Sequence, residues 1–260
     1  MHPEKTLFTR QHPDRQLRRF FAGPEQFQED EVVLSPGETH HLIRVLRLPL
    51  GGRVEVSDGC GRIFAAEISL IEPTAARLRI ISELNFGPES TLHITLGLAL
   101  VRAETFDLVV RQVTEMGILR LIPFHSTRTL IKPEGWKKTR HNRWLRLSQE
   151  ALKSSQRKVL PQIAAPVEFF QVLDGPEDLK VIFWENQREL DSKINLASGP
   201  RPRSVRALIG PEGGFTDLEV AAARDAGFLL MGLGPRRLRV ETAAMAAVTV
   251  LQYLWGDLGA

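Results

Sequence analysis

The sequence has 260 residues but only one cysteine, Cys60, and no long apolar run. A single cysteine excludes a disulfide framework and cysteine-rich metal sites, and it is typical of a reducing compartment. The longest apolar candidate, residues 242–255, is shorter than the ~18 residues that indicate a membrane span. Residues 1–5 (MHPEK) lack the apolar core of a signal peptide. We therefore expect a soluble, cytoplasmic protein that does not enter a membrane.

Motifs that mark several common enzyme classes are also missing. There is no GxGxxG fingerprint, no phosphate loop ending in GK[ST], no HExxH, no CxxC and no GxSxG. Dinucleotide-dependent enzymes, P-loop NTPases, zinc proteases and serine hydrolases are therefore disfavoured. The adjacent His40 and His41 cannot share one helix face, so we expect no metal site there.

The sequence also has little net charge, because its 34 Lys and Arg residues nearly balance its 31 Asp and Glu residues. The cations are nevertheless concentrated in residues 128–158, which hold ten basic residues and two acidic ones. Nucleic-acid phosphates favour such a stripe, since neutralising them releases counterions. The alternative is a solvated helix face. The stripe predicts contact with RNA or DNA.

The chain is predicted to form two domains. Residues 31–84 read as short strands with turns between them, which is typical of a small β-rich domain, and residues 85–90 have the composition of a linker. From residue 91 onward, apolar runs of strand length alternate with helical stretches, the pattern of a parallel sheet covered by helices on both faces. We therefore expect an α/β fold class, with a β-rich domain over residues 1–84 and an α/β domain over residues 85–260.

Most elements can be assigned from periodicity and capping signals. In the first domain, strands are expected at 53–56, 62–68 and 75–81, and Ser35 and Glu38 predict a short helix that continues through residues 40–47. In the second domain, strands are expected at 92–100, 118–123, 181–185, 206–210 and 228–233. Helices are expected at 105–116, 136–157, 216–226 and 241–255, with caps at Thr105 and Thr216 and stops at Gly117, Pro161 and Gly227.

Two glycine-containing loops each follow an apolar strand and precede a helix. The first glycine loop covers residues 210–215 (GPEGGF) and the second covers residues 232–243 (GLGPRRLRVETA). In open α/β sheets, ligands bind beyond the carboxyl ends of strands, and glycine there lets a ligand approach the backbone. One such loop alone is equally well explained as an ordinary turn. Two in one sheet favour a ligand site.

These loops resemble those of a known family. Gly210-Pro211-Glu212-Gly213-Gly214-Phe215, followed by Leu233-Gly234-x-x-x-Leu238-Arg239-x-Glu241-Thr242-Ala243, resembles the RsmE-type 16S ribosomal RNA uridine N3-methyltransferases. The resemblance extends to Arg19-Phe20-Phe21, to residues 41–51 (HLIRVLRLPLG), and to residues 114–118 (TEMGI) with Pro123 and Arg128, so it spans almost the whole chain. It implies a PUA-like RNA-binding β-barrel followed by a SPOUT methyltransferase domain with a deep trefoil knot.

The resemblance also implies the cofactor, the partners and the residues that bind them. The cofactor would be S-adenosylmethionine, the substrate 16S rRNA within the small ribosomal subunit, and the assembly a homodimer without metal. The implied cofactor-binding residues are Glu185, Gly210, Pro211, Glu212, Gly213, Gly214, Leu233, Gly234, Leu238, Thr242 and Ala243. The expected RNA-binding residues are Arg19, Arg47, Arg128, Lys137, Lys138, Arg143 and Arg157.

Arg239 and Glu241 are the candidate catalytic residues. Uracil N3 becomes a nucleophile only after it loses its proton, and a fixed guanidinium opposite O2 or O4 would stabilise the resulting anion. We assign this role to Arg239. Glu241 is two residues further along, where it could orient the arginine, cap the helix or accept the N3 proton.

Two other functions stay open on the sequence. An RNA-binding ribosome-assembly factor could have kept this fold without catalysis, and binding of S-adenosylmethionine would separate it from the enzyme. The same chemistry could also act on a different uridine or a different RNA. The alanine-rich helix at 241–255 is expected to pack in the core and at a two-fold subunit interface.

Overall fold

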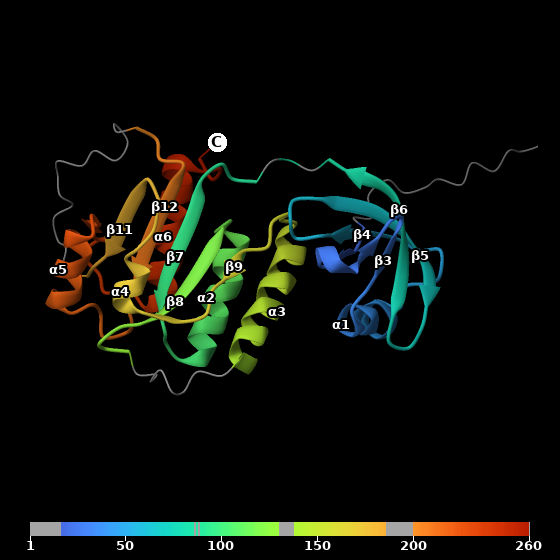
Figure 1. Cartoon of the computed structure of the whole chain (residues 1–260), viewed down its shortest axis with the longest axis horizontal. Helices are drawn as coiled ribbons and strands as arrows, with labels where there is room; N and C mark the ends of the chain where they lie inside the picture. Colours follow the sequence, from blue (N-terminus) through green and yellow to red (C-terminus); the bar gives the residue numbers. More distant parts are fainter. Residues whose placement is uncertain (1–16, 86, 88, 130–137, 186–199, 260) are drawn as a thin grey trace, which may run out of the picture. The chain divides into compact units, whose positions relative to one another are not determined.

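The computed structural model describes residues 17–85, 87, 89–129, 138–185 and 200–259 (Figure 1). Its contacts divide the chain into two units. The first unit consists of Met1–Ser57 and Ile63–Leu84, and the second consists of Asp58–Arg62 and Asn85–Ala260. No helix in the described part of the chain is long and apolar enough to cross a bilayer.

The first unit is a six-stranded sheet in the order β1-β4-β5-β6-β3-β2. Its strands are β1 (Arg19–Phe21), β2 (Phe27–Gln28), β3 (Glu31–Val33), β4 (Arg53–Ser57), β5 (Ile63–Ile71) and β6 (Ala76–Leu84), with a 3-10 turn, η1 (Pro24–Gln26), after β1. Because side chains alternate along a strand, one face of the sheet collects a core that includes the fully buried Phe20, Val56 and Leu78. The three strands predicted in this unit are confirmed.

A short helix, α1 (Pro36–His40), connects β3 to β4 and continues as a π-helical segment, η2 (His41–Val45). The predicted cap is confirmed, since the Ser35 hydroxyl accepts a hydrogen bond from the Glu38 N–H at 3.3 Å. Two residues beyond η2, Arg47 is exposed and has a φ of +52°. Arg47 therefore lies in a left-handed turn, with its side chain exposed to solvent.

The second unit is built on a parallel sheet in the order β10-β8-β7-β12-β11-β13, with β9 paired to β8. Its strands are β7 (His93–Ala99), β8 (Arg120–His125), β9 (Gln162–Ile163), β10 (Val167–Glu168), β11 (Leu179–Phe183), β12 (Ser204–Ile209) and β13 (Leu229–Met231). The predicted parallel α/β sheet is confirmed. The two-residue strands β9 and β10 were not predicted, because so short a segment carries no periodic signal.

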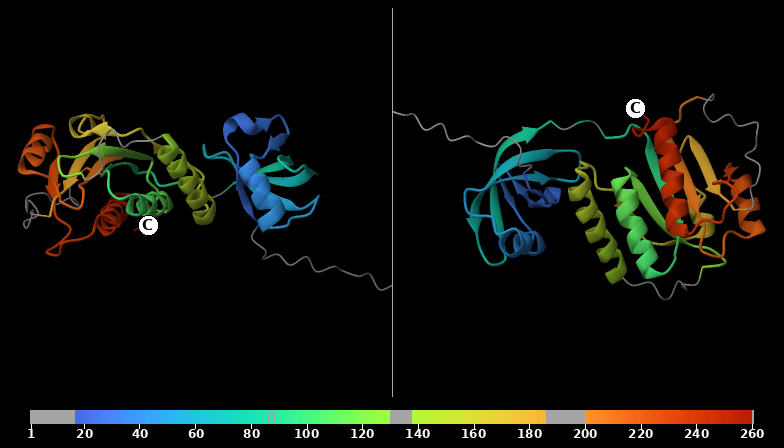
Figure 2. Two further views of the ribbon diagram at one scale, coloured as in Figure 1. Left: turned by 90° about the horizontal axis from the view of Figure 1, so that it is seen from below. Right: turned by 180° about the vertical axis from the view of Figure 1, so that it is seen from behind.

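Helices cover both faces of this sheet (Figure 2). One face carries α2 (Ala103–Glu115), α3 (Lys138–Ser155) and α6 (Val240–Trp255), and the other carries α4 (Phe169–Val172) and α5 (Asp217–Asp225). Strand β12 supplies both cores, with Val205 and Ala207 on the first face and Leu208 on the second. Helix α3 packs on α2, where Phe106 and Trp144 stack with ring centroids 4.0 Å apart.

Two predicted helix boundaries are wrong. Helix α2 is capped by Arg102, whose backbone is extended, and not by Thr105. Helix α3 ends at Ser155, before the predicted end at 157 and the predicted stop at Pro161, because Gln156 turns the backbone into the left-handed region with a φ of +62°. The predicted first residues of that helix, 136 and 137, lie outside the described residues.

The other capping predictions are confirmed. Thr216 caps α5, and its hydroxyl accepts from the Glu219 N–H at 3.2 Å. Gly117 and Gly227 follow α2 and α5 with φ values of +86° and +85°, which glycine adopts readily.

Candidate ligand site

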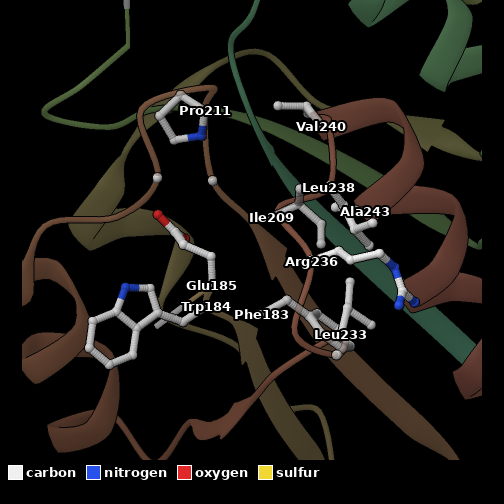
Figure 3. Close-up of a pocket in the computed structure, with 13 residues that line it drawn as sticks. Phe183, Trp184, Glu185, Ile209, Pro211, Leu233, Arg236, Leu238, Val240 and Ala243 are labelled. Carbon is white, nitrogen blue, oxygen red and sulfur yellow. The ribbon is translucent and has the colours of Figure 1, made fainter. Parts of the chain in front are cut away.

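A pocket opens beyond the carboxyl ends of β11, β12 and β13 (Figure 3). Three segments of the chain form it, and each directly follows one of those strands. The lining residues are Phe183, Trp184, Glu185, Ile209, Gly210, Pro211, Gly214, Leu233, Gly234, Arg236, Leu238, Val240 and Ala243. Because β11 lies between β12 and β13, the three strand ends meet at one edge of the sheet, which is where α/β folds bind ligands.

Most of the residues predicted to hold a ligand lie in this pocket. The lining includes Glu185, Gly210, Pro211, Gly214, Leu233, Gly234, Leu238 and Ala243. Glu212 and Gly213 are exposed at the tip of the first glycine loop, and Thr242 is exposed in the first turn of α6, so these three do not line it.

Sequence reasoning missed five lining residues, which are Phe183, Trp184, Ile209, Arg236 and Val240. Phe183, Trp184 and Ile209 lie in predicted strands, and Arg236 and Val240 lie in the second glycine loop, but no sequence signal assigned any of the five a role of its own.

The first glycine loop is shaped by a tight turn. Gly214 has a φ of +68° and its N–H donates to the Pro211 carbonyl at 2.9 Å. A β-carbon on Gly214 would overlap the carboxylate of Glu185, which reaches the loop from the end of β11 (Figure 3). The positive φ therefore favours glycine at this position, and a larger residue would also displace the Glu185 carboxylate from the loop.

The polar groups of the pocket are few. Glu185 and Arg236 are the only charged residues among the thirteen that line it. The indole Nε1 of Trp184 is buried and has no hydrogen-bond partner among the described residues. The Trp184 side chain packs against the core beneath α4 and α5, whereas Phe183, Leu233 and Ala243 belong to the core on the other face of the sheet. The remaining wall is apolar or backbone, which suits a ligand with both a flat apolar part and hydrogen-bonding groups.

The predicted catalytic pair lies at the start of α6. Arg239 is the N-cap residue of α6, and its carbonyl accepts from the Ala243 N–H at 2.8 Å. Its backbone lies between the lining residues Leu238 and Val240, while its own side chain is exposed. Glu241 is half-buried in the first helical turn. Neither side chain forms an ion pair with any described residue, so the guanidinium is available to a substrate.

Two of the arginines predicted to contact RNA are buried in ion pairs within the chain. Arg19 pairs with Glu55 at 2.8 Å, and its side chain is 4% exposed. Arg157 pairs with Glu89 at 3.0 Å, and its side chain is 9% exposed. Such burial favours a structural role for both arginines.

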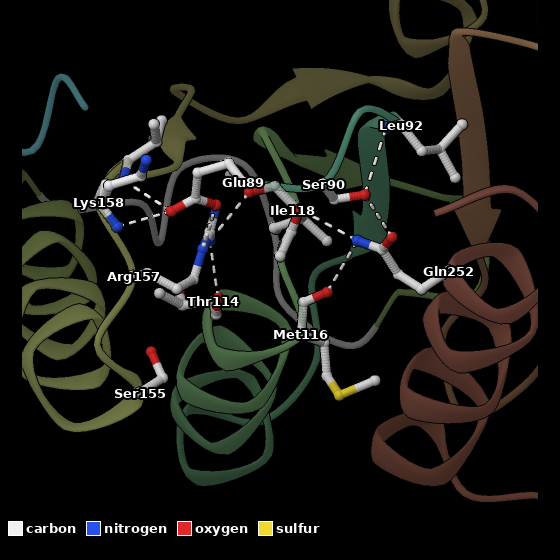
Figure 4. Close-up of polar contacts among 12 residues, drawn as sticks. Glu89, Ser90, Leu92, Thr114, Met116, Ile118, Ser155, Arg157, Lys158 and Gln252 are labelled. Carbon is white, nitrogen blue, oxygen red and sulfur yellow. Dashed lines mark hydrogen bonds and ion pairs between the residues drawn. The ribbon is translucent and has the colours of Figure 1, made fainter. Parts of the chain in front are cut away.

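Figure 4 shows how the Arg157 pair holds the end of α2. Arg157 Nη1 donates to the carbonyls of Thr114 at 2.7 Å and Ile118 at 3.2 Å. The other oxygen of Glu89 accepts from the Lys158 N–H at 2.6 Å. The guanidinium therefore adds hydrogen bonds to two carbonyls at the end of α2, one of which, that of Thr114, also accepts from the Gly117 N–H at 3.2 Å.

A second buried side chain, Gln252 of α6, holds the same region (Figure 4). Its amide nitrogen donates to the Met116 carbonyl at 3.0 Å, and its oxygen accepts from the Ser90 hydroxyl at 2.7 Å. A β-carbon on Gly117 would lie 2.8 Å from that amide nitrogen. Packing at the end of α2 therefore explains the residues at positions 114–117 (TEMG).

The other predicted RNA-binding residues differ in their surroundings. Arg47 and Lys138 are exposed, whereas Arg143 is 53% exposed and pairs with Asp107. Arg128 donates hydrogen bonds to the first glycine loop. Lys137 lies outside the described residues.

Comparison with known proteins agrees with this arrangement. A family model described as an RNA methyltransferase domain matches residues 88–252, and one described as an RNA methyltransferase PUA domain matches residues 34–81. Ribosomal RNA small subunit methyltransferase E of Synechocystis sp. is 35% identical over 240 residues, which are 91% of this chain and 77% of that protein. The Bacillus subtilis protein of the same name is 27% identical over 91% of this chain and 96% of its own length.

Solved structures extend the likeness to the fold. The crystal structure of ribosomal RNA small subunit methyltransferase E from Neisseria gonorrhoeae bound to S-adenosyl methionine has a TM-score of 0.82 and 29% identity, and it covers 94% of this chain and 100% of that chain. A Legionella pneumophila protein in complex with the cofactor SAM has a TM-score of 0.85 and 30% identity over the same shares of both chains. The chain therefore belongs to the RNA methyltransferase family that includes ribosomal RNA small subunit methyltransferase E.

Proposed function

We propose that this protein transfers a methyl group from S-adenosylmethionine to N3 of a uridine in 16S rRNA. The observation that carries the proposal is the pocket at the ends of β11, β12 and β13, which is lined by the glycine loops of the family. Relatives of the same family have S-adenosyl methionine bound in their structures.

The pocket residues fit this cofactor. The Glu185 carboxylate offers an acceptor for its hydroxyl or ammonium groups. Leu233 and Leu238 supply apolar surface for the adenine ring, and Gly210 exposes the backbone of its loop. The cofactor itself supplies an electrophilic methyl group on its sulfonium. The chain's task is to hold it and to exclude water from it.

Arg239 is proposed to stabilise the uracil anion. Its backbone is fixed as the N-cap of α6, so the exposed guanidinium starts from a rigid point next to the pocket. A preorganised cation of this kind acts most strongly when negative charge develops on the uracil oxygens. For Glu241 we propose an orienting or helix-capping role, because a carboxylate in the first turn complements the helix N-terminus. Acceptance of the N3 proton is the alternative.

We propose that residues 1–84 form the PUA-like RNA-binding domain and residues 85–260 the SPOUT methyltransferase domain with its trefoil knot. The family model for the PUA domain and the non-sequential strand order of the second unit support this assignment. The exposed cations Lys138 and Arg146 of α3 are proposed to contact rRNA phosphates. A role on rRNA is consistent with a cytoplasmic location.

A homodimer is proposed through α6. One face of this helix is fully buried at Ala247 and Leu251, whereas Val250 is 37% and Tyr253 66% exposed. Apolar and aromatic side chains on an exposed helix face suit a subunit interface. Sedimentation of the full chain at micromolar concentration is expected to give a dimer, and a monomer would contradict this part of the proposal.

The experiment for the whole proposal measures binding and then transfer. Calorimetry with the purified chain is expected to detect S-adenosylmethionine binding. Labelled cofactor is then incubated with 16S rRNA, free and in small ribosomal subunits from a deletion strain, and the modified nucleoside is identified by mass spectrometry. N3-methyluridine is the expected product. Cofactor binding without transfer to either substrate would favour the assembly-factor function, and another methylated nucleoside would overturn the N3 assignment.

A further inference from the structure

A short segment outside the pocket holds the first glycine loop in place. This segment, Ser126 to Arg128, directly follows β8. Arg128 Nη1 donates to the Gly213 carbonyl at 2.8 Å and to the Phe215 carbonyl at 3.3 Å. One guanidinium nitrogen thus bridges two carbonyls of the loop that forms one wall of the pocket.

The loop is also shaped to accept this arginine. A β-carbon on Gly213 would lie 3.2 Å from Cβ and 3.3 Å from Cδ of Arg128, closer than side-chain atoms normally approach. Gly213 has no positive φ, in contrast to Gly214. The glycine at position 213 is therefore explained by the close approach of Arg128 and not by backbone conformation.

The buried carboxylate of Glu219 also connects the Ser126–Arg128 segment to Thr216, the residue that follows the first glycine loop. Glu219 of α5 is 4% exposed, and its Oε1 accepts from the Thr127 N–H at 2.8 Å. Its Oε2 accepts from the Thr216 N–H at 2.8 Å and from the Thr216 hydroxyl at 3.0 Å. Burial alone would raise the pKa of Glu219, but the N–H donors of Thr216 and Thr127 outweigh it and lower the pKa. The carboxylate is thus ionised at neutral pH.

Phe215 connects the first glycine loop, which Arg128 contacts, to the wall of the pocket. The Phe215 ring stacks on Phe124 at an interplanar angle of 4°, and a β-carbon on Gly210 would lie 3.1 Å from the same ring. Gly210 lines the pocket. A shift of the Phe215 backbone, to which Arg128 is bonded, would therefore move the ring on which Gly210 rests.

We infer that Arg128 is a positioning residue for the cofactor, which fixes the backbone of Gly213 and Phe215 so that residues 210–214 keep their binding conformation. This inference rests on the proposed function, because it takes S-adenosylmethionine as the ligand. The two hydrogen bonds occupy Nη1 and give the exposed Arg128 a role within the chain that its prediction as an RNA contact did not include.

The first test measures cofactor affinity in the full chain. Arg128→Ala is expected to weaken S-adenosylmethionine binding on the order of tenfold, since it removes two hydrogen bonds from a charged donor. Arg128→Lys is expected to recover only part of the affinity, because an ammonium on a different stem cannot reproduce the guanidinium geometry. The matched control is Arg120→Ala, an exposed arginine at the other end of β8, which is expected to bind the cofactor normally.

The outcomes separate this inference from the proposed function. If the wild-type chain binds no S-adenosylmethionine, the proposed function fails. If the wild-type chain binds it and Arg128→Ala binds it equally well, the positioning role is overturned while the function stands. A loss confined to RNA affinity, with a smaller salt dependence, would instead make Arg128 a phosphate contact.

The second test uses the fit between Arg128 and Gly213. Gly213→Ala is also expected to weaken cofactor binding, because its β-carbon displaces the arginine from the loop. Since both substitutions break the same contact, the double variant is expected to lose little more affinity than the worse single variant. Fully additive losses would show that the two residues act independently and would contradict the inference.

Discussion

The carboxylate of Glu185 lies where a β-carbon on Gly214 would have to be. Glu185 follows β11 and Gly214 follows β12, so this contact joins two walls of the ligand pocket. Gly214 also has a φ of +68°, which is unfavourable for residues with a side chain. Position 214 therefore favours glycine for its backbone conformation, and an added β-carbon would also displace the Glu185 carboxylate.

We expect Gly214→Ala to weaken S-adenosylmethionine binding by at least about tenfold, because displacement of Glu185 adds to a backbone cost of about 1–2 kcal/mol. Gly227→Ala is the matched control, since Gly227 has a φ of +85° but nothing within 4 Å of the added β-carbon. The control is expected to lose comparable stability and to keep its cofactor affinity, measured by calorimetry. Equal losses of affinity in the two variants would indicate general destabilisation.

Arg239→Ala is expected to slow methyl transfer without releasing the cofactor. The side chain is exposed and does not line the pocket, so cofactor affinity does not depend on it. Removing one donor that stabilises a developing anion lowers kcat on the order of 100-fold or more. Arg239→Lys keeps the charge but not the planar fork and is expected to restore part of the rate. Near-normal turnover of Arg239→Ala with saturating cofactor and RNA would contradict the proposed role of Arg239 in stabilising the uracil anion.

Arg157 is expected to matter for folding and not for RNA affinity. Arg157→Ala removes the cation that pairs with the Glu89 carboxylate and the guanidinium hydrogen bonds to two carbonyls near the end of α2, which costs about 3 kcal/mol for a buried pair. Arg146→Ala is the control on α3, because Arg146 is 65% exposed and lies 4.0 Å from Glu150, and such pairs contribute about 0–1 kcal/mol. Urea denaturation of both variants measures the difference. A stable Arg157→Ala chain with weak RNA binding would contradict the structural role.

Local sequence signals predicted the fold well where they act within one turn or one strand. Thr216 and Glu219 form their predicted capping box because both partners lie within four residues. The predicted strands of the parallel sheet were found because each is a continuous apolar run. The order of the strands could not be predicted, although it is this order that places the ends of β11, β12 and β13 together.

The roles of charged residues were harder to predict, because their partners are distant in the sequence. Arg157 and Glu89 are 68 residues apart, and Arg128 reaches a carbonyl 85 residues away. A sequence displays the charge of an arginine but not the group that it binds. Arg128, Arg143 and Arg157 of the stripe were therefore all predicted as RNA contacts, although Arg157 is buried and Arg128 donates a hydrogen bond to the first glycine loop.

The exposed part of the basic stripe is expected to contact rRNA. Lys138→Glu combined with Arg146→Glu is expected to weaken RNA binding and to reduce the slope of log affinity against log salt by about one for each phosphate that is no longer neutralised. Arg224→Glu on α5 is the control, because α5 packs on the opposite face of the sheet from α3. Cofactor affinity is expected to stay unchanged in all variants. RNA affinity equal to that of the control would show that the stripe is only solvated.

Glu219 makes the free energy of unfolding depend on pH, and the direction of its pKa shift gives the sign of that dependence. Burial would raise its pKa, but the Thr216 and Thr127 N–H donors outweigh burial and hold the pKa below the ordinary value of 4.5. A carboxyl whose pKa is lowered by folding stabilises the chain above the unfolded pKa, and that stability is lost as pH falls through the folded pKa.

We therefore expect Glu219→Gln to lower the free energy of unfolding by about 1–3 kcal/mol at pH 7, since the amide cannot accept from the same three donors. Below pH 4.5 the difference from the wild-type chain is expected to shrink, because protonation removes the same contribution from the wild type. Glu177 also has a lowered pKa, but it is present in both chains and cancels in the difference. Urea denaturation at a series of pH values measures the difference in the free energy of unfolding between the wild type and Glu219→Gln. A difference that stays constant far below the ordinary pKa of 4.5 would mean that ionisation of Glu219 does not contribute.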